Sequence, residues 1–202
     1  MSSYSFVYLA SQSPRRRQLL EQLGVSYELL LPDATEDAEA LETVLSSESP
    51  KSYVQRVTML KLSAAMLRMK RRGLSPAPVL CSDTTVALGP SILGKPHDTG
   101  HAQMMLGALS GQTHRVLTSV AVGSARRKLQ ALSVSTVRFA PMTKQQIKHY
   151  VASGESMGKA GAYAVQGRAA AFIEHINGSY SGIMGLPMFE TAQILREFGF
   201  KV

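Results

Sequence analysis

Several features are scarce in this 202-residue chain, and each scarcity narrows the class of protein. The single cysteine, Cys81, excludes a disulfide within the chain and fits a reducing compartment, so we expect a cytoplasmic protein. No apolar run approaches the roughly 20 residues that span a bilayer. Residues Met1–Ser11 lack the basic start and the apolar core of a secretion signal. The sequence therefore predicts no attachment to a membrane.

Familiar catalytic and binding motifs are also missing. There is no Walker-type phosphate loop and no serine-nucleophile elbow. The five histidines are dispersed without the spacing of a zinc site. The densest basic run, Arg68–Arg72, has no interleaved aromatic residues, which argues against binding of single-stranded nucleic acid. Cations at a helix C-terminus complement the helix dipole, and this is the simpler explanation of the run.

The overall composition favours one soluble, basic domain with an anionic partner. A formal net charge of +8 suits a nucleic acid, a nucleotide or a membrane surface, without choosing among them. Hydrophobic residues make up 45% of the chain, enough for a substantial core. The length fits one domain or one domain with two lobes. Because no repeat or low-complexity linker divides the chain, we treat residues 1–202 as a single domain.

The pattern of apolar residues predicts a mixed α and β protein. Strands are expected at 5–10, 27–31, 77–88, 116–122 and 129–139, with the last two joined as a hairpin through 123–128. Helices are expected from 14 to about 24, from 50 to about 73, and at 99–109, 143–152 and beyond 187. The Gly-rich region 154–185 holds two short strand-like runs, and we read 159–167 as a Gly-bracketed strand. We expect an α/β (mixed α+β) fold around one mixed sheet flanked by helices.

The most informative segment is residues 9–17, Leu-Ala-Ser-Gln-Ser-Pro-Arg-Arg-Arg, where a strand leads directly into a helix. Ser13 can cap this helix, with Pro14 at its first position. Unpaired backbone N–H groups at a helix start favour anions. Arginine adds forked donors that match the geometry of phosphate. The segment therefore predicts a phosphate-binding corner.

Asp83 is the strongest candidate for a catalytic group. The apolar run Val79–Cys81 leads into Ser82-Asp83-Thr84, which places the aspartate at the carboxyl end of a strand. Ligands of open α/β sheets bind beyond such ends. A carboxylate there can hold a metal or take a proton from water. The alternative is a turn aspartate that caps local N–H groups.

Four further residues are weaker candidates, and three of them have two interpretations each. Lys95, in a Gly-Lys-Pro turn, is either a phosphate contact or an exposed turn lysine. Lys61 lies near the apolar side of its helix, where it either faces a ligand or extends to solvent. The Gln166 amide either reads the edge of a base or ends a strand. Glu36 is one of several acids in Pro32–Ser49, an expected loop without Lys or Arg, and nothing local distinguishes it.

Six motifs, in this order, resemble those of the Maf-like nucleoside triphosphate pyrophosphatase family over nearly the whole chain. They are Leu-Ala-Ser-Gln-Ser-Pro-Arg-Arg at 9–16, Ser-Asp-Thr at 82–84, Ile-Leu-Gly-Lys-Pro at 92–96, Leu-Ser-Gly-Gln-Thr-His at 109–114, Lys-Ala-Gly-Ala-Tyr-Ala-Val-Gln-Gly at 159–167 and Gly-Ser-Tyr-Ser-Gly-Ile-Met-Gly-Leu-Pro at 178–187. The resemblance implies an elongated sheet with two lobes around a nucleotide cleft. It implies hydrolysis of a nucleoside triphosphate between the α- and β-phosphates, aided by a divalent cation, Mg²⁺ or Mn²⁺. A homodimer is implied only by this resemblance.

The resemblance also implies a role for each matching residue. Asp83 would be the general base and a metal ligand, with Glu36 as a second metal ligand. The substrate-binding residues would be Ser11, Ser13, Arg15, Lys61, Thr84, Lys95 and Gln166, of which Arg15, Thr84 and Gln166 match positions tied to substrate choice.

Two of these positions suggest the branch of the family. Thr84 after the aspartate and Gln166 in the later segment look like the branch that acts on dTTP and UTP. The sibling branch prefers 7-methyl-GTP and tends to place glutamine and glutamate there. One alternative is therefore the same chemistry on 7-methyl-GTP or a damaged purine nucleotide. The other is a non-enzymatic nucleic-acid-binding or division-regulating protein, although no recognised nucleic-acid module is present and we expect no stable nucleic-acid partner.

Overall fold

The computed structural model describes residues 4–33, 36–37 and 40–202. The strands are β1 (Val7–Leu9), β2 (Tyr27–Leu29), β3 (Val79–Leu88), β4 (Ser91–Leu93), β5 (Thr113–Gly123), β6 (Lys128–Phe139) and β7 (Ile173–Asn177). The helices are α1 (Pro14–Gln22), α2 (Pro50–Arg71), α3 (Thr99–Leu109), α4 (Lys144–Ala152), α5 (Tyr180–Met184) and α6 (Met188–Glu197). Short 3₁₀ turns are η1 (Ala40–Glu42), η2 (Ala160–Ala162) and η3 (Arg168–Phe172).

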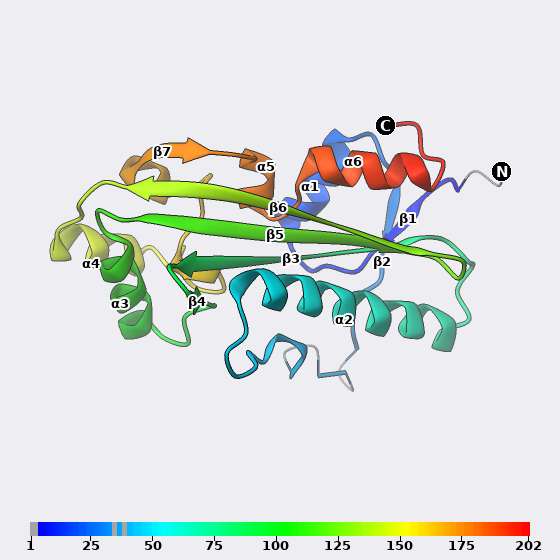
Figure 1. The fold of residues 1–202 in the computed structure, drawn as a ribbon, viewed down its shortest axis with the longest axis horizontal. Coiled ribbons are helices and arrows are strands. Elements are labelled where there is room, and N and C mark those ends of the chain that lie inside the picture. Colours follow the sequence, from blue (N-terminus) through cyan, green and yellow to red (C-terminus); the bar gives the residue numbers. More distant parts are fainter. Residues whose placement is uncertain (1–3, 34–35, 38–39) are drawn as a thin grey trace.

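All strands belong to one mixed seven-stranded sheet in the order β2-β1-β3-β5-β6-β7, with β4 added at β3 (Figure 1). The pairs of β1 with β2 and β3 are parallel, and the remaining pairs are antiparallel. Strands β5 and β6 form the predicted hairpin, with Gly123 opposite Lys128. The predicted mixed α/β fold is confirmed.

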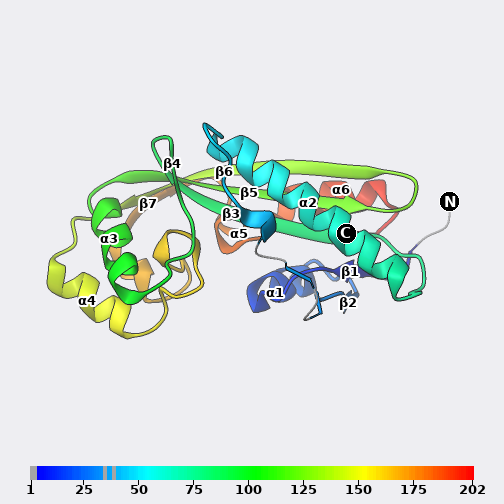
Figure 2. The ribbon, with the colours of Figure 1, turned by 90° about the horizontal axis from the view of Figure 1, so that it is seen from below.

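Three long strands make the molecule elongated. β6 has 12 residues, which corresponds to about 40 Å of extended chain. One end of the sheet packs under a core that includes Met105, Phe139 and Tyr150. The other end packs under a core that includes Leu20 and Leu195. Figures 1 and 2 show α3 and α4 at the first end and α1 and α6 toward the second, so two lobes share the same strands.

The central helix α2 and the pair α1 and α6 cover opposite faces of the sheet (Figure 1). The alternation of side chains along each strand explains this arrangement. Leu80 on β3 packs in the core of α1 and α6, whereas its neighbour Cys81 packs against α2. Local signals set the start of α2: the Ser49 hydroxyl accepts from the N–H of Ser52, and Pro50 occupies the first turn.

The predicted strand at 159–167 is wrong. The structure has the turn η2 there, and both Gly161 and Ala162 have left-handed backbone, with φ of 67° and 62°. Extended strands require negative φ, so the segment cannot continue as a strand. A Cβ at Gly161 would lie 2.8 Å from Cγ1 of Val86, which means that glycine allows this turn to pack directly on β3.

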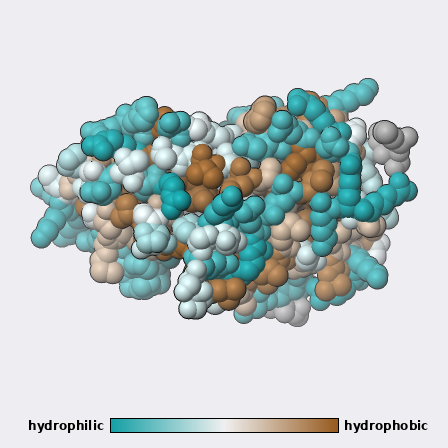
Figure 3. Space-filling model, viewed as in Figure 1, coloured by the Kyte–Doolittle hydropathy of each residue, from teal (hydrophilic) through white to brown (hydrophobic). Residues whose placement is uncertain are grey.

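The surface in Figure 3 is mostly hydrophilic, with hydrophobic residues in small groups among the polar ones. No helix in the described parts of the chain is both long enough and apolar enough to cross a membrane.

Candidate active site

A change of partners along β3 creates an opening in the sheet. Strand β1 pairs with residues 79–80 of β3, and β4 pairs with residues 86–88 on the same edge, opposite β5. Residues 81–85 pair with neither, because the chain leaves β3 after Leu9 and turns into α1. Asp83 therefore lies in the middle of β3, and the expectation that it ends a strand is wrong. Its side chain is largely buried, but it borders the opening because the neighbouring strand stops short of it.

A cavity of about 970 Å³ occupies this opening, with walls from both lobes. Every residue that the sequence singled out lines it: Ser11, Ser13, Arg15, Glu36, Lys61, Asp83, Thr84, Lys95 and Gln166. These positions are spread over more than 150 residues of sequence, and the fold brings them to a single pocket. Their individual roles stay predictions.

The start of α1 forms one wall, as predicted. Ser13 caps the helix by accepting from the N–H of Arg16 at 3.5 Å. The Ser11 hydroxyl accepts from the N–H of Ser13 and from Nη1 of Arg16, both at 3.2 Å. Arg15 donates from Nε to the Met184 carbonyl at 3.3 Å. The hydroxyls thus hold the corner in shape while the arginines reach across to the segment after α5.

Arg16 is a cavity residue that the sequence analysis did not select. Its Nε donates to the Gly185 carbonyl at 2.7 Å, and its Nη2 donates to the Thr84 hydroxyl at 3.4 Å. Burial lowers the pKa of Arg16, and the negative charge of Asp83 opposes that shift. In the sequence, the one feature that points to Arg16 is its place in the run of three arginines, Arg15–Arg17. Consecutive helical residues point about 100° apart, so the run alone could not show which arginine faces the site.

The catalytic candidate belongs to a line of alternating charges. Oδ1 of Asp83 accepts from Nζ of Lys61 at 2.5 Å. The same Nζ donates to Oε1 of Glu42 at 2.7 Å, and Nζ of Lys95 donates to Oε2 of Glu42 at 3.0 Å. Tyr53 donates its hydroxyl to the Glu42 carbonyl at 2.9 Å, which fixes the backbone at that point.

Glu42 is therefore the acid of the 32–49 segment that faces the lysines, and the sequence analysis did not identify it. Burial alone would raise the pKa of Glu42, but Lys61 and Lys95 together lower it below its usual value. No periodic pattern or local motif distinguishes this glutamate from its acidic neighbours in the sequence.

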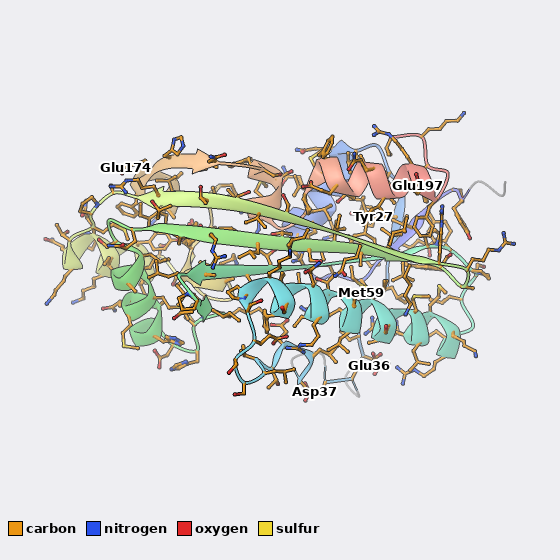
Figure 4. The ribbon with its side chains drawn as sticks, viewed as in Figure 1. Tyr27, Glu36, Asp37, Met59, Glu174 and Glu197 are labelled. Carbon is orange, nitrogen blue, oxygen red and sulfur yellow. The ribbon has the colours of Figure 1, made fainter. Side chains whose placement is uncertain are left out.

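Glu36 forms ion pairs with two arginines of α2 and pairs with neither Lys61 nor Lys95. Its carboxylate accepts from Nε and Nη2 of Arg68 at 2.8 and 2.7 Å, and it pairs with Arg71 at 3.0 Å. Figure 4 shows Glu36 beneath α2. The hydrogen bonds from Arg68 lower the pKa of Glu36. Arg68 is itself buried and donates to the Leu30 carbonyl at 2.8 Å. The pair anchors the acidic segment to α2, and the role of Glu36 as a metal ligand stays a prediction.

Gln166 lies on the part of the cavity wall formed by the segment 158–166. Its side chain is exposed to the cavity, and no hydrogen bond ties its amide to any residue that the structure describes. An amide in this state can donate and accept at the same time, which suits the edge of a nucleobase.

Together, the opened sheet and the cation-lined cavity define an α/β protein with a pocket for a phosphorylated ligand. Arg15, Arg16, Lys61, Lys95 and Lys159 line the same cavity as Asp83, together with the buried Arg68. The chain belongs to the Maf-like protein family, whose sequence model matches residues 6–198.

Curated relatives support this assignment. A dTTP/UTP pyrophosphatase of Albidiferax ferrireducens is 69% identical over 98% of both chains. Another from a Polaromonas species is 67% identical over the full length of both, and one from Cupriavidus metallidurans is 64% identical over 96% of this chain and 98% of the relative. Among solved structures, the Staphylococcus aureus Ham1 protein matches at 12% identity and a TM-score of 0.41, covering 66% of this chain and 71% of that one, too distant to support an argument.

Proposed function

We propose that this protein is a nucleoside triphosphate pyrophosphatase that hydrolyses dTTP and UTP to the monophosphate and pyrophosphate. The observation that carries the proposal is that Asp83 lines one cavity together with Arg15, Arg16, Lys61 and Lys95, and that Lys61 contacts it directly. The full-length relatives named dTTP/UTP pyrophosphatase support the same substrate.

The cations perform the electrostatic part of the reaction. A triphosphate is highly anionic, and more charge develops on the leaving pyrophosphate as the bond breaks. Phosphoryl transfer depends mainly on positioning and on stabilising this charge. Arginines match phosphate oxygens with forked donors, while lysines act as point charges. The geometry places both kinds of cation around the carboxylate.

Asp83 performs the proton transfer. In the proposed mechanism its carboxylate orients a water molecule and accepts one proton as the water oxygen attacks the α-phosphorus. The bond between the α-phosphorus and the bridging oxygen breaks, and that oxygen leaves with the pyrophosphate. Lys61, bonded to Oδ1 at 2.5 Å, fixes the orientation of the carboxylate. A base must lie within hydrogen-bond reach of the proton that it takes, and the open edge of β3 gives water that access.

The divalent cation expected from the family, Mg²⁺ or Mn²⁺, fits the oxygen chemistry of this pocket. Among the described residues, no three His, Cys, Asp or Glu side chains gather into a ready-made cage. Mg²⁺ is commonly held by one or two carboxylates with phosphate oxygens and water, so Asp83 together with the substrate suffices. When bound, such a cation lowers the pKa of water and offsets phosphate charge.

The choice of base is assigned to Thr84 and Gln166. Uracil and thymine share one edge with a carbonyl and an N–H group, and a primary amide can pair with both. A site that relies on paired hydrogen bonds rejects a base that leaves them unpaired. Hydrolysis of both dTTP and UTP requires in addition that the sugar 2′-hydroxyl is tolerated.

The test is a pyrophosphate-release screen over canonical and modified triphosphates, with and without Mg²⁺ or Mn²⁺. We expect dTTP and UTP to give the highest kcat/KM, with the monophosphate and pyrophosphate as products. Asp83→Asn should fold and lose at least about 10²-fold in kcat, as expected for loss of a general base. Its matched control is Glu174→Gln, an exposed acid on β7 paired with Arg138, which should behave as wild type.

Three outcomes would contradict the proposal. A clear preference for 7-methyl-GTP would replace the pyrimidine assignment. Near-wild-type turnover by Asp83→Asn would remove the base. Salt-dependent DNA binding without any nucleotide hydrolysis would favour the non-enzymatic alternative. The cytoplasmic location and the homodimer expected from the sequence stay predictions.

A further inference from the structure

The segment that carries Gln166 lacks regular secondary structure. It lies between η2, which ends at Ala162, and η3, which begins at Arg168. Within it, the N–H of Gly167 donates to the Ala164 carbonyl at 3.0 Å, which makes a single tight turn around Gln166. One turn does not fix the direction of an exposed side chain. The position of Gln166 therefore depends on what holds this turn from outside.

Glu155 holds the turn on its C-terminal side. Oε2 of Glu155 accepts from the N–H of Arg168 at 3.0 Å. The carboxylate also lies directly against Gly167, since a Cβ at that position would come within 2.2 Å of Oε1. Glycine at 167 is thus a consequence of the carboxylate behind it. Gly167 and Arg168, the two residues that follow Gln166, both contact the side chain of Glu155.

Tyr150 extends this support to the N-terminal side. Its hydroxyl donates to Oε1 of Glu155 at 2.8 Å and accepts from the N–H of Ala164 at 3.3 Å. Tyr150 is buried in the core of its lobe, and helix α4 holds it in place. Glu155 and Tyr150 together therefore clamp the backbone on both sides of Gln166.

Glu155 does not belong to the cavity wall, unlike Gln166 in front of it. Its charge nevertheless reaches two cations of that wall. Burial lowers the pKa of Arg15 and of Lys159, and the negative charge of Glu155 opposes the shift at both. The residue supports the pocket from behind and makes no contact with the space that a nucleotide would occupy.

We propose that Glu155 is a positioning residue that sets base selectivity by fixing Gln166. The inference rests on the proposed function, in which Gln166 pairs with the base. If the clamp is loosened, the backbone that carries Gln166 is no longer held in one place, while Asp83, Lys61 and Lys95 stay on elements outside the clamp. Selectivity and KM should then suffer more than the chemical step.

Glu155→Gln is the matched test of the clamp. Glutamine keeps the size of the side chain, but its NH₂ group replaces one acceptor. If the glutamine carbonyl keeps the N–H of Arg168, its NH₂ group faces the hydroxyl of Tyr150, which must then accept and loses the carboxylate to which it donates in the wild type. Tyr150→Phe is the second variant, because it removes only the hydroxyl that links Glu155 to Ala164. Glu174→Gln, at the far edge on β7 (Figure 4), is the control.

The assay measures kcat and KM for UTP and CTP, and inhibition by tripolyphosphate, which has no base. Glu155→Gln should raise KM for UTP about tenfold and lower the preference for UTP over CTP by a similar factor, an effect of about 1.4 kcal/mol. Its kcat and its inhibition by tripolyphosphate should stay within about twofold of wild type, because those depend on the phosphate side. Tyr150→Phe should shift selectivity in the same direction, and thermal unfolding shows that each variant is folded.

The outcomes separate this inference from the function on which it rests. If wild type does not hydrolyse UTP or does not prefer it to CTP, the proposed function fails and the inference with it. If wild type is selective and a folded Glu155→Gln protein is equally selective, only the inference is overturned. An equal loss of kcat and of tripolyphosphate binding would also overturn it, since that pattern indicates general damage to the lobe. If Glu155→Gln does not fold, Tyr150→Phe decides by the same criteria.

Discussion

Removing the charge of Glu42 should strengthen the binding of nucleotide. Glu42 holds Lys61 at 2.7 Å and Lys95 at 3.0 Å, and in the proposed function the triphosphate binds the same two cations. Substrate binding must therefore replace these contacts. The side chains of Glu42, Lys61 and Lys95 are 27%, 21% and 49% exposed, so solvent screens both pairs. Partly exposed pairs contribute about 0.2–1 kcal/mol each, which gives a combined cost of about 1 kcal/mol.

This cost corresponds to roughly a fivefold change in Kd. The assay is titration calorimetry with a UTP analogue whose α–β bridge is a methylene group, run with and without Mg²⁺. We expect Glu42→Gln to bind about fivefold more tightly than wild type, with a smaller difference at high salt because screening weakens the wild-type pairs. The control is Glu48→Gln, which lies in the same acidic segment but pairs with Arg56 at 2.6 Å. Equal or weaker binding by Glu42→Gln would refute the reasoning and show that the carboxylate takes part in binding.

Two further predictions concern buried titratable groups. Burial lowers the pKa of His114 from 6.5 to about 4. The unfolded chain therefore takes up a proton below pH 6.5 that the folded protein refuses until about pH 4, so stability falls as the pH drops between those values. Urea titrations should show that the free energy of unfolding falls by about 2 kcal/mol between pH 7 and pH 5. The same fall in the His114→Gln variant would show that His114 is not its cause. Burial also raises the pKa of Cys81 to about 12. A disulfide reagent should therefore label this thiol only after the protein unfolds. Rapid labelling of the native protein would disprove this prediction.

The elements that the sequence predicted well are those with local start signals. Ser13 before Pro14, Ser49 before Pro50 and Thr143 each cap a helix in the structure, with the hydroxyl accepting from a backbone N–H three residues on. Such caps depend only on neighbours in the chain, so they can be read without knowledge of the fold. The hairpin of β5 and β6 was predictable for the same reason, because its strands are adjacent in sequence.

The elements that it predicted poorly depend on distant contacts. The turn at Gly161 packs on Val86, far away in the chain, and the apolar pattern of 159–167 gave no sign of its positive φ. The opening beside Asp83 exists because β1 ends early and β4 begins late along β3. Glu42 reaches a lysine 53 residues away. Propensity and periodicity contain no information of this kind.

The fold holds the candidate phosphate-side and base-side residues of the cavity on different elements. Asp83, Lys61 and Lys95 stand on β3, α2 and the turn after β4, all held by the long strands that both lobes share. Gln166 stands on a turn that the rest of its lobe holds through Glu155 and Tyr150. The two groups are joined where the N–H of Gly161 donates to the carbonyl of Gly94 at 3.0 Å, next to Lys95, so we expect changes in the clamp around Gln166 to affect the choice of base more than the phosphate chemistry. Thr84 is the exception, since it follows Asp83 on β3 and accepts from Arg16; in the proposed function it therefore links the choice of base to the wall that carries Asp83.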